Sequence, residues 1–163
     1  MIRIGIVDDE EIMRLKIHQC IKEILKEQES VEIRSYDCAE DFLEEVQKKT
    51  HFDILFSDIQ MLEMNGLELG KRLQKDMPNL YIIYITAYME YAVESYKISA
   101  YQYILKEDME IRLPQIKRKL LNQIQHEYAQ FRVVGTNGIQ KKIYLKYTLY
   151  MCIKGKKQNM CIM

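Results

Sequence analysis

The sequence has little of what marks membrane, secreted or zinc-binding proteins. It contains no tryptophan, 2 prolines and 4 cysteines among 163 residues. The cysteines form no CxxC pair, so neither a zinc site nor a disulfide framework is supported, and reduced cytosolic thiols are expected. No apolar run approaches the roughly 18 residues of a membrane span, and the N-terminus runs directly into a predicted strand instead of a signal peptide. We therefore expect a cytoplasmic protein with no membrane partner.

Acidic residues are missing from the end of the chain. All 24 Asp and Glu residues precede residue 128, whereas seven Lys and Arg residues follow residue 130. The formal net charge of zero therefore combines −7 in the first part with +7 in the second. This asymmetry predicts a metal or phosphoryl site in the acidic first part of the chain and a segment that faces anions in the basic second part. A charged strand edge that resists aggregation is an equally reasonable interpretation of the basic end.

Apolar strands alternate with amphipathic helices along residues 1–128. Five strands are predicted, at residues 2–7, 31–36, 53–57, 80–86 and 101–105, and each is followed by a helix. The third strand is apolar until its end, which is typical of a strand buried on both faces. Right-handed crossovers then predict an α/β fold, a doubly wound five-stranded parallel sheet with helices on both faces. We expect Pro114 in the first turn of the last helix, where proline is tolerated.

The pattern changes near residue 129. Residues 131–134 and 139–145 flank a segment that contains two glycines, which predicts a β-hairpin, and residues 147–153 have the pattern of a further strand. A segment this short rarely holds a core of its own. We therefore predict a complete domain at residues 1–128 and a partial, β-rich output segment at residues 129–163.

Charged side chains directly follow three of the predicted strands. Asp8 and Asp9 follow the first strand, Asp58 the third and Lys106 the fifth. Because the carboxyl ends of parallel strands converge on one crevice, these side chains are expected to meet there. Carboxylates that share a small site need a cation to stay ionised, and Mg²⁺ suits oxygen ligands. A metal, a nucleophilic carboxylate and a lysine together predict phosphoryl transfer. Taken alone, the pair at positions 8 and 9 would more often cap a helix.

These residues, in this order, resemble the receiver domain of bacterial response regulators, which has a flavodoxin-like fold. The resemblance is carried by residues 6–10, 56–61, 66–69, 86–87 and 103–106. It implies a two-component system in which a sensor histidine kinase transfers a phosphoryl group to Asp58. It further implies that Lys106 pairs with the phosphoryl oxygens. The protein would catalyse only its own phosphoryl transfer and autodephosphorylation.

The resemblance also implies a metal site. Asp9 and Asp58 would bind Mg²⁺, Asp8 would act mostly through water, and the backbone carbonyl of Gln60 would complete the ligand set. The three histidines, His18, His51 and His126, have no ligand spacing and are expected to be solvated or to pack.

Two further residues are implied to act as a switch. Thr86 would donate its hydroxyl to the phosphoryl group, and Tyr103 would rotate inward as it does so. The neighbouring apolar and tyrosyl side chains would form a phosphorylation-dependent homodimer surface or simply pack; they are Tyr91, Val93, Tyr96 and Tyr101.

The chain departs from the family pattern at two positions. Leu62 and Glu107 stand where the family usually has proline, the second of these in a cis bond. Because a cis bond without proline costs roughly 3 kcal/mol, we expect the bond between Lys106 and Glu107 to be trans. The loop is then expected to be looser, which would alter the lifetime of the phosphoryl group.

The basic end resembles the first strands of a LytTR-type DNA-binding domain, as found in LytR- and AgrA-like regulators. The resemblance lies in residues 141–145 and 149–156, with Tyr147-Thr148 where the family has an acidic residue. It implies a transcription-regulating lineage, with promoter DNA as a partner only if a full C-terminal domain exists.

Two other functions stay open. A stand-alone receiver would act through protein contacts or as a phosphate sink. An aspartate-nucleophile phosphohydrolase would place a second Asp two residues after the nucleophile as its acid and base, but Gln60 occupies that position.

Overall fold

The computed structural model describes residues 1–26, 30–129, 133–134 and 140–141. The chain divides into two compact units, Met1–Leu120 and Leu121–Met163. In the first unit, one parallel sheet has the strand order β2-β1-β3-β4-β5. Its strands are β1 (Ile2–Val7), β2 (Val31–Tyr36), β3 (Ile54–Ser57), β4 (Tyr81–Thr86) and β5 (Gln102–Leu105). This is the strand order of the flavodoxin-like fold, so the predicted fold class is confirmed.

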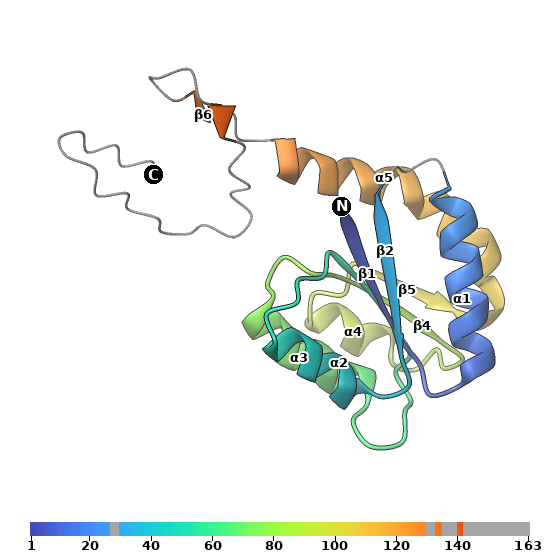
Figure 1. Cartoon of the computed structure of the whole chain (residues 1–163). Coiled ribbons are helices and arrows are strands. Elements are labelled where there is room, and N and C mark those ends of the chain that lie inside the picture. The colour runs from blue at the N-terminus through green and yellow to red at the C-terminus, as the bar shows by residue number, and fades with distance from the viewer. Residues whose placement is uncertain (27–29, 130–132, 135–139, 142–163) are drawn as a thin grey trace. The chain divides into compact units, whose positions relative to one another are not determined.

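Helices follow the strands and cover both faces of the sheet. They are α1 (Glu11–Ile24), α2 (Ala39–Gln47), α3 (Gly66–Asp76), α4 (Ala92–Lys97) and α5 (Met109–Ala129). In Figure 1, α1 and the beginning of α5 lie on one side of the sheet, and α2, α3 and α4 lie on the other. This arrangement leaves the carboxyl ends of the strands free of helices, so that loops form that edge.

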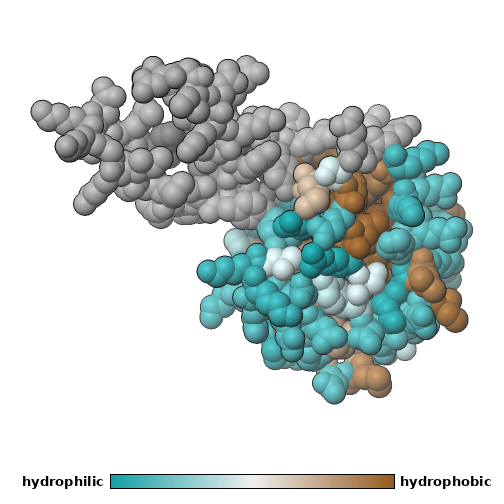
Figure 2. Space-filling view, viewed as in Figure 1, coloured by the Kyte–Doolittle hydropathy of each residue, from teal (hydrophilic) through white to brown (hydrophobic). Residues whose placement is uncertain are grey.

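The central strands are buried on both faces, as their sequences predicted. Every residue of β3 is buried, as are the last five residues of β4. The side chains of Leu55, Ile83 and Tyr84 are completely removed from solvent. The exposed face seen in Figure 2 is mainly hydrophilic, with hydrophobic side chains in small separate areas. The sheet interior therefore supplies the core on which the loops are built.

The helix boundaries follow local capping rules in α3 but not in α5. Asn65 caps α3, because its side-chain oxygen accepts a hydrogen bond from the Glu68 amide at 2.9 Å. The last helix begins earlier than Pro114 indicated, because a 3₁₀ helix, η1 (Lys106–Asp108), leads from β5 directly into it at Met109. Pro114 therefore lies in the second turn, not in the first as expected. There it donates no hydrogen bond to the carbonyl of Glu110.

Within the described residues no peptide bond is cis, so the trans bond expected between Lys106 and Glu107 is confirmed. None of the helices in this part of the chain is long and apolar enough to cross a membrane. In the second unit, β6 (Val133–Val134) and β7 (Gln140–Lys141) pair antiparallel, which confirms the predicted hairpin for these residues. The turn between them and the predicted strand at residues 147–153 lie outside the described residues.

Candidate functional site

Three loops at the carboxyl edge of the sheet bring the predicted charged residues together. Asp8 follows β1, Asp58 follows β3 and Lys106 follows β5. The amide of Asp58 donates to the carbonyl of Val7 at 2.8 Å, which continues the ladder between β1 and β3 by one residue. Both aspartates therefore leave the sheet from adjacent strands, in a backbone conformation that the sheet itself fixes.

Lys106 forms ion pairs with three carboxylates. Its Nζ lies 2.7 Å from Asp58 Oδ2, 2.8 Å from Glu10 Oε1 and 3.1 Å from Asp8 Oδ2. Burial of the ammonium group works to lower the pKa of Lys106, but the hydrogen bonds to Asp58 and Glu10 outweigh it and raise the pKa well above its ordinary value. The lysine is therefore a fixed positive charge at any physiological pH.

The Asp58 carboxylate is held by backbone amides on one side. Its Oδ1 accepts hydrogen bonds from the amide of Ile59 at 2.5 Å and from that of Gln60 at 3.3 Å. Ser57 Oγ donates to the carbonyl of the same aspartate at 2.7 Å. With Oδ1 occupied, Oδ2 is the oxygen presented to Lys106, and the carboxylate has one orientation.

Asp8 is completely buried and only partly compensated. Its Oδ1 accepts a hydrogen bond from the amide of Glu10 at 2.9 Å, while its Oδ2 makes no hydrogen bond with good geometry. Burial raises the pKa of Asp8, although the contacts with Glu10 and Lys106 work against the rise. The ion pair with Lys106 at 3.1 Å is therefore the main compensation for the charge on this oxygen.

The acidic group fits a divalent cation. Carboxylate oxygens of Asp8, Glu10 and Asp58 all lie within 4.8 Å of one another. Three carboxylates against one ammonium group leave about two uncompensated negative charges. Hard oxygen donors of this kind suit Mg²⁺ better than softer metals.

Only some of the predicted metal ligands have side chains in the acidic group. Asp8 and Asp58 lie in the acidic group, whereas Asp9 is exposed and lies outside it. Gln60 is also exposed, and its Nε2 donates to the hydroxyl of Tyr91 at 3.3 Å. Glu10, to which the sequence analysis gave no role, belongs to the group instead. Its position directly after an acidic pair was the only signal for it.

Thr86 and Tyr103 lie on neighbouring strands beside the acidic group. Thr86 ends β4 and is completely buried, and its hydroxyl oxygen has no hydrogen-bond partner among the described residues. Tyr103 lies on β5 and its hydroxyl donates to the backbone carbonyl of Tyr88, in the loop that follows β4. Burial, helped by the negative charges of Glu90 and Asp58, raises the pKa of Tyr103 to about 12. It is therefore a neutral hydrogen-bond donor.

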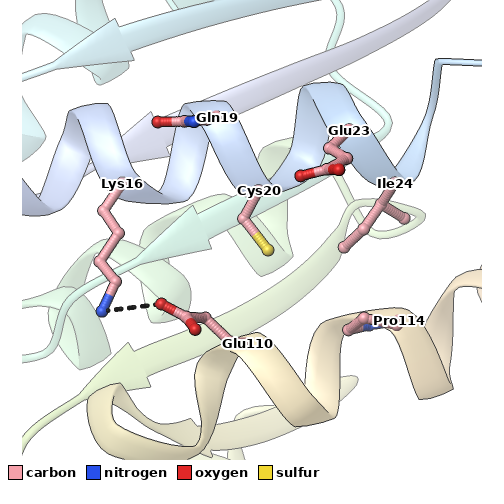
Figure 3. Close-up of a pocket in the computed structure, with 7 residues that line it drawn as sticks. All are labelled: Lys16, Gln19, Cys20, Glu23, Ile24, Glu110 and Pro114. Carbon is pink, nitrogen blue, oxygen red and sulfur yellow. Dashed lines mark ion pairs between the residues drawn. The ribbon is translucent and has the colours of Figure 1, made fainter.

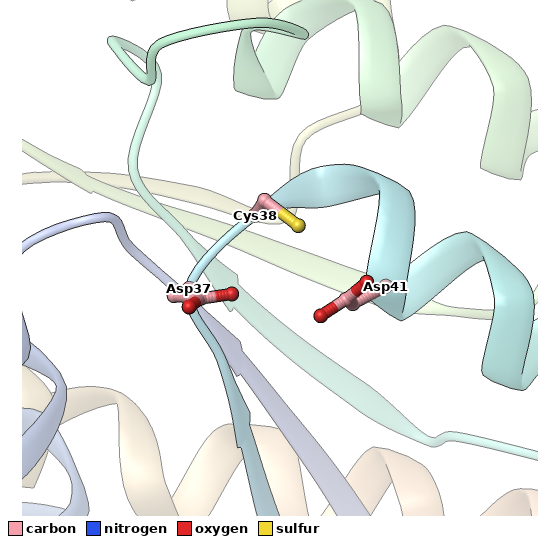
Figure 4. A group of neighbouring side chains, drawn as sticks. All are labelled: Asp37, Cys38 and Asp41. Carbon is pink, nitrogen blue, oxygen red and sulfur yellow. The ribbon is translucent and has the colours of Figure 1, made fainter.

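Two other clusters lie outside the acidic group. A shallow pocket between α1 and α5 is crossed by the ion pair of Lys16 and Glu110, at 3.1 Å, with Cys20 pointing into it (Figure 3). Burial raises the pKa of Cys20, which makes its thiol a poor nucleophile. At the junction of β2 and α2, Asp37, Cys38 and Asp41 lie close together (Figure 4), but both carboxylates are exposed.

The comparisons with known proteins agree with this geometry. The model of the response regulator receiver domain matches residues 4–120. The chain belongs to this family. The predicted receiver domain is therefore confirmed, and the site described above is the acidic site of a receiver.

The chain is similar to two curated bacterial regulatory proteins. The chain is 37% identical over 128 residues to the sensory transduction protein LytT of Bacillus anthracis, which covers 78% of the chain and 50% of LytT. It is 32% identical over 115 residues to the transcriptional regulatory protein LytR of Staphylococcus aureus, covering 71% of the chain and 45% of LytR. The chain thus spans about half the length of the curated relatives it matches.

Solved structures resemble the receiver over a similar length. The response regulatory domain of protein mrkE from Klebsiella pneumoniae is 27% identical, with a TM-score of 0.67 over 77% of this chain and 99% of that one. The response regulator TrrA from Thermotoga maritima, solved in complex with Mg²⁺-BeF, is 30% identical, with a TM-score of 0.57 over 75% of this chain and 98% of that one.

Proposed function

We propose that this chain is the phosphorylation-switched receiver of a two-component response regulator, with Asp58 as phosphoacceptor and a sensor histidine kinase as donor. One observation carries the proposal: the Asp58 carboxylate has Oδ1 fixed by two backbone amides and Oδ2 directed at Lys106, 2.7 Å away. A nucleophile held in one orientation beside a fixed cation is what phosphoryl transfer requires, because positioning and charge supply most of the catalysis.

In the proposed reaction, Asp58 Oδ2 attacks the phosphorus of a phosphohistidine. The new bond joins phosphorus to this oxygen, the phosphorus–nitrogen bond breaks, and the electron pair stays on the imidazole nitrogen, which takes up a proton. Lys106, already 2.7 Å from Oδ2, then pairs with the charge that has moved onto the phosphoryl oxygens. Attack by water on the acyl phosphate would reverse the modification.

Asp8, Asp58 and the Gln60 carbonyl would hold Mg²⁺, with Glu10 or Asp9 as a further carboxylate. The support is the acidic group with its uncompensated charge, and the buried Asp8 Oδ2, which has an ion pair with Lys106 but no hydrogen bond. When bound, the ion offsets negative charge on the transferred group. The protein's own part is to keep these oxygens close together despite their repulsion.

The switch would run through Thr86 and Tyr103. The Thr86 hydroxyl is buried with no partner, so a phosphoryl oxygen would give it one. A change at Thr86 would reposition the loop that Tyr103 contacts through the Tyr88 carbonyl. Beside this loop, Val93 and Tyr96 are exposed by 72% and 58%, which makes α4 the proposed homodimer surface.

The chemistry would be confined to the chain's own aspartate. A phosphohydrolase needs a general acid near the nucleophile, and at the expected position Gln60 has only an amide, which bonds Tyr91 at 3.3 Å. We therefore propose no turnover of external phosphate esters. Hydrolysis of such esters that depends on Asp58 would contradict this.

The output would be transcriptional. Relatives of this receiver carry the names LytT and LytR, and one is described as a transcriptional regulatory protein. The positive charge after residue 130 would favour contact with phosphates. Promoter binding would require a C-terminal domain as long as those of the relatives.

Phosphorylation of the purified chain by acetyl phosphate tests the proposal. We expect Mg²⁺-dependent incorporation of about one phosphoryl group per chain, with the alkali lability of an acyl phosphate, and none in Asp58→Asn. The exposed residue in Asp76→Asn, on α3, provides a matched control. Equal incorporation by the wild type and Asp58→Asn would overturn the assignment of Asp58.

A further inference from the structure

Tyr84 is a buried polar residue that the proposed reaction does not use. It lies in β4, two residues before Thr86, and its side chain is completely removed from solvent. Its hydroxyl donates a hydrogen bond to the backbone carbonyl of Gly66 at 3.0 Å. Burial raises the pKa of Tyr84 far above its ordinary value, so the hydroxyl is always a donor. A phenol placed in a core needs such a partner, and Tyr84 finds it at the first residue of α3.

The helix is shaped to receive this hydroxyl. Gly66 and Gly70 lie four residues apart, on one side of α3. A Cβ atom on Gly70 would lie 2.2 Å from the Tyr84 hydroxyl oxygen, so any larger residue would displace the phenol. The absence of a side chain at Gly70 is what admits the hydroxyl between β4 and α3.

Gly66 in turn lies against the phosphoacceptor. A Cβ atom on Gly66 would lie 1.9 Å from the backbone oxygen of Asp58, so only glycine permits this approach. The Gly66 amide donates to the carbonyl of Ile59 at 2.8 Å, and the amide of Ile59 donates to Asp58 Oδ1 at 2.5 Å. The Ile59 carbonyl shares its peptide group with the Gln60 amide, which donates to the same Asp58 oxygen at 3.3 Å. One residue, Ile59, therefore separates the amide of Gly66 from the bonds that orient the carboxylate.

We propose that Tyr84 is a positioning residue for Asp58. Its hydroxyl holds Gly66, the Gly66 amide holds the carbonyl of Ile59, and the amides of Ile59 and Gln60 fix the rotation of the Asp58 carboxylate. This inference rests on the proposed role of Asp58 as phosphoacceptor. It predicts that the Tyr84 hydroxyl acts on the rate of phosphoryl transfer, because a small misplacement of a nucleophile is costly.

The test compares Tyr84→Phe with Ile82→Val. Both residues are buried, on one face of β4 and in the same core cluster, but only tyrosine contacts α3 through a hydroxyl. Acetyl phosphate is varied at saturating Mg²⁺, and phosphorylation is followed over time. We expect Tyr84→Phe to lower the maximal rate constant about three- to tenfold, the effect of one lost buried hydrogen bond, without raising the half-saturating donor concentration in proportion. Ile82→Val should keep the wild-type rate constant.

A second measurement separates this inference from the proposed function. Hydrogen exchange at the amides of Ile59 and Gly66 should become faster in Tyr84→Phe than in Ile82→Val at equal global stability. A wild-type rate constant in Tyr84→Phe, or unchanged exchange at both amides, would overturn the inference. If the wild type itself accepts no phosphoryl group, the proposed function fails, and the exchange rates alone decide whether Tyr84 holds this segment.

Discussion

Lys106 Nζ lies 2.7 Å from Asp58 Oδ2, which joins the end of β5 to the end of β3 by one ion pair. The same ammonium group contacts Asp8 and Glu10, so it is the common partner of the acidic group. Only 14% of the Lys106 side chain is exposed. Within the part of the chain that the structure describes, Lys106 is therefore the cation that pairs with these carboxylates.

Replacing Lys106 with methionine should destabilise the protein in metal-free buffer. The change keeps most of the side-chain volume but leaves the acidic group without its cation, so we expect the free energy of unfolding to fall by about 2–4 kcal/mol. Urea denaturation measures this. Lys71→Met is the matched control, because Lys71 pairs with Glu94 in an exposed ion pair at 3.2 Å, and its loss should cost about 0.5 kcal/mol or less. Equal losses in the two variants would contradict the account.

Replacing Asp8 with asparagine should reveal the cost of burying a carboxylate. Burial raises the pKa of Asp8 above 3.8, so this group favours the folded state below that pH, and the contribution is lost as the pH rises through the raised value. In EDTA, the stability of Asp8→Asn relative to the wild type should therefore increase as the pH rises above about 4 and through the raised pKa of Asp8.

Addition of Mg²⁺ should make the wild type more stable than Asp8→Asn, because only the wild type retains both carboxylate oxygens of residue 8 for the ion. Urea midpoints across the pH range, with and without Mg²⁺, provide the measurement. A difference in stability that does not change with pH would show that burial of Asp8 does not govern its ionisation.

Replacing Thr86 with valine should separate stability from switching. The buried hydroxyl has no partner, so its removal should leave the free energy of unfolding unchanged or raise it by up to about 1 kcal/mol. The phosphorylated variant should nevertheless lose the change in hydrogen exchange around Tyr88 and Tyr103. Thr86→Ser, which retains the hydroxyl, is the control and should keep that change. A marked loss of stability in Thr86→Val would mean that the hydroxyl has a partner in the resting protein.

Replacing Gly66 with alanine should displace the backbone next to Asp58. The new Cβ would lie 1.9 Å from the Asp58 carbonyl oxygen and 2.9 Å from Ser57 Oγ. Overpacking of this kind costs about 1–3 kcal/mol, and the phosphorylation rate should fall by more than this loss of stability explains. Lys75→Ala, at an exposed position of the same helix, should change neither quantity. Full activity in Gly66→Ala would disprove the close contact between α3 and Asp58.

The sequence was sufficient to predict the fold and the meeting of Asp8, Asp58 and Lys106. Strand periodicity identified the five strands, and the carboxyl ends of parallel strands must lie at one edge, so residues that directly follow them converge. The direction of each side chain does not follow from strand periodicity. The exposure of Asp9 and the inclusion of Glu10 depend on the backbone between β1 and α1, which no periodicity reveals.

Other features were hidden because they arise from contacts between distant segments. The bond from Tyr84 to Gly66 joins β4 to α3, and in the sequence Tyr84 is one more apolar residue of a buried strand. The start of α5 was misplaced because a 3₁₀ turn after β5 continues directly into the helix. Because proline is common in the first turn of a helix, Pro114 led to a predicted start of α5 that was too late in the sequence.

Chemical mapping of the phosphorylated residue tests the central claim most directly. The chain is treated with acetyl phosphate and Mg²⁺, the acyl phosphate is reduced with borohydride, and peptides are sequenced by mass spectrometry. The account predicts homoserine at residue 58 and unmodified aspartate at residues 8, 9 and 53. Homoserine at residue 8, 9 or 53, or no homoserine anywhere in the chain, would contradict the assignment of Asp58 as the phosphoacceptor.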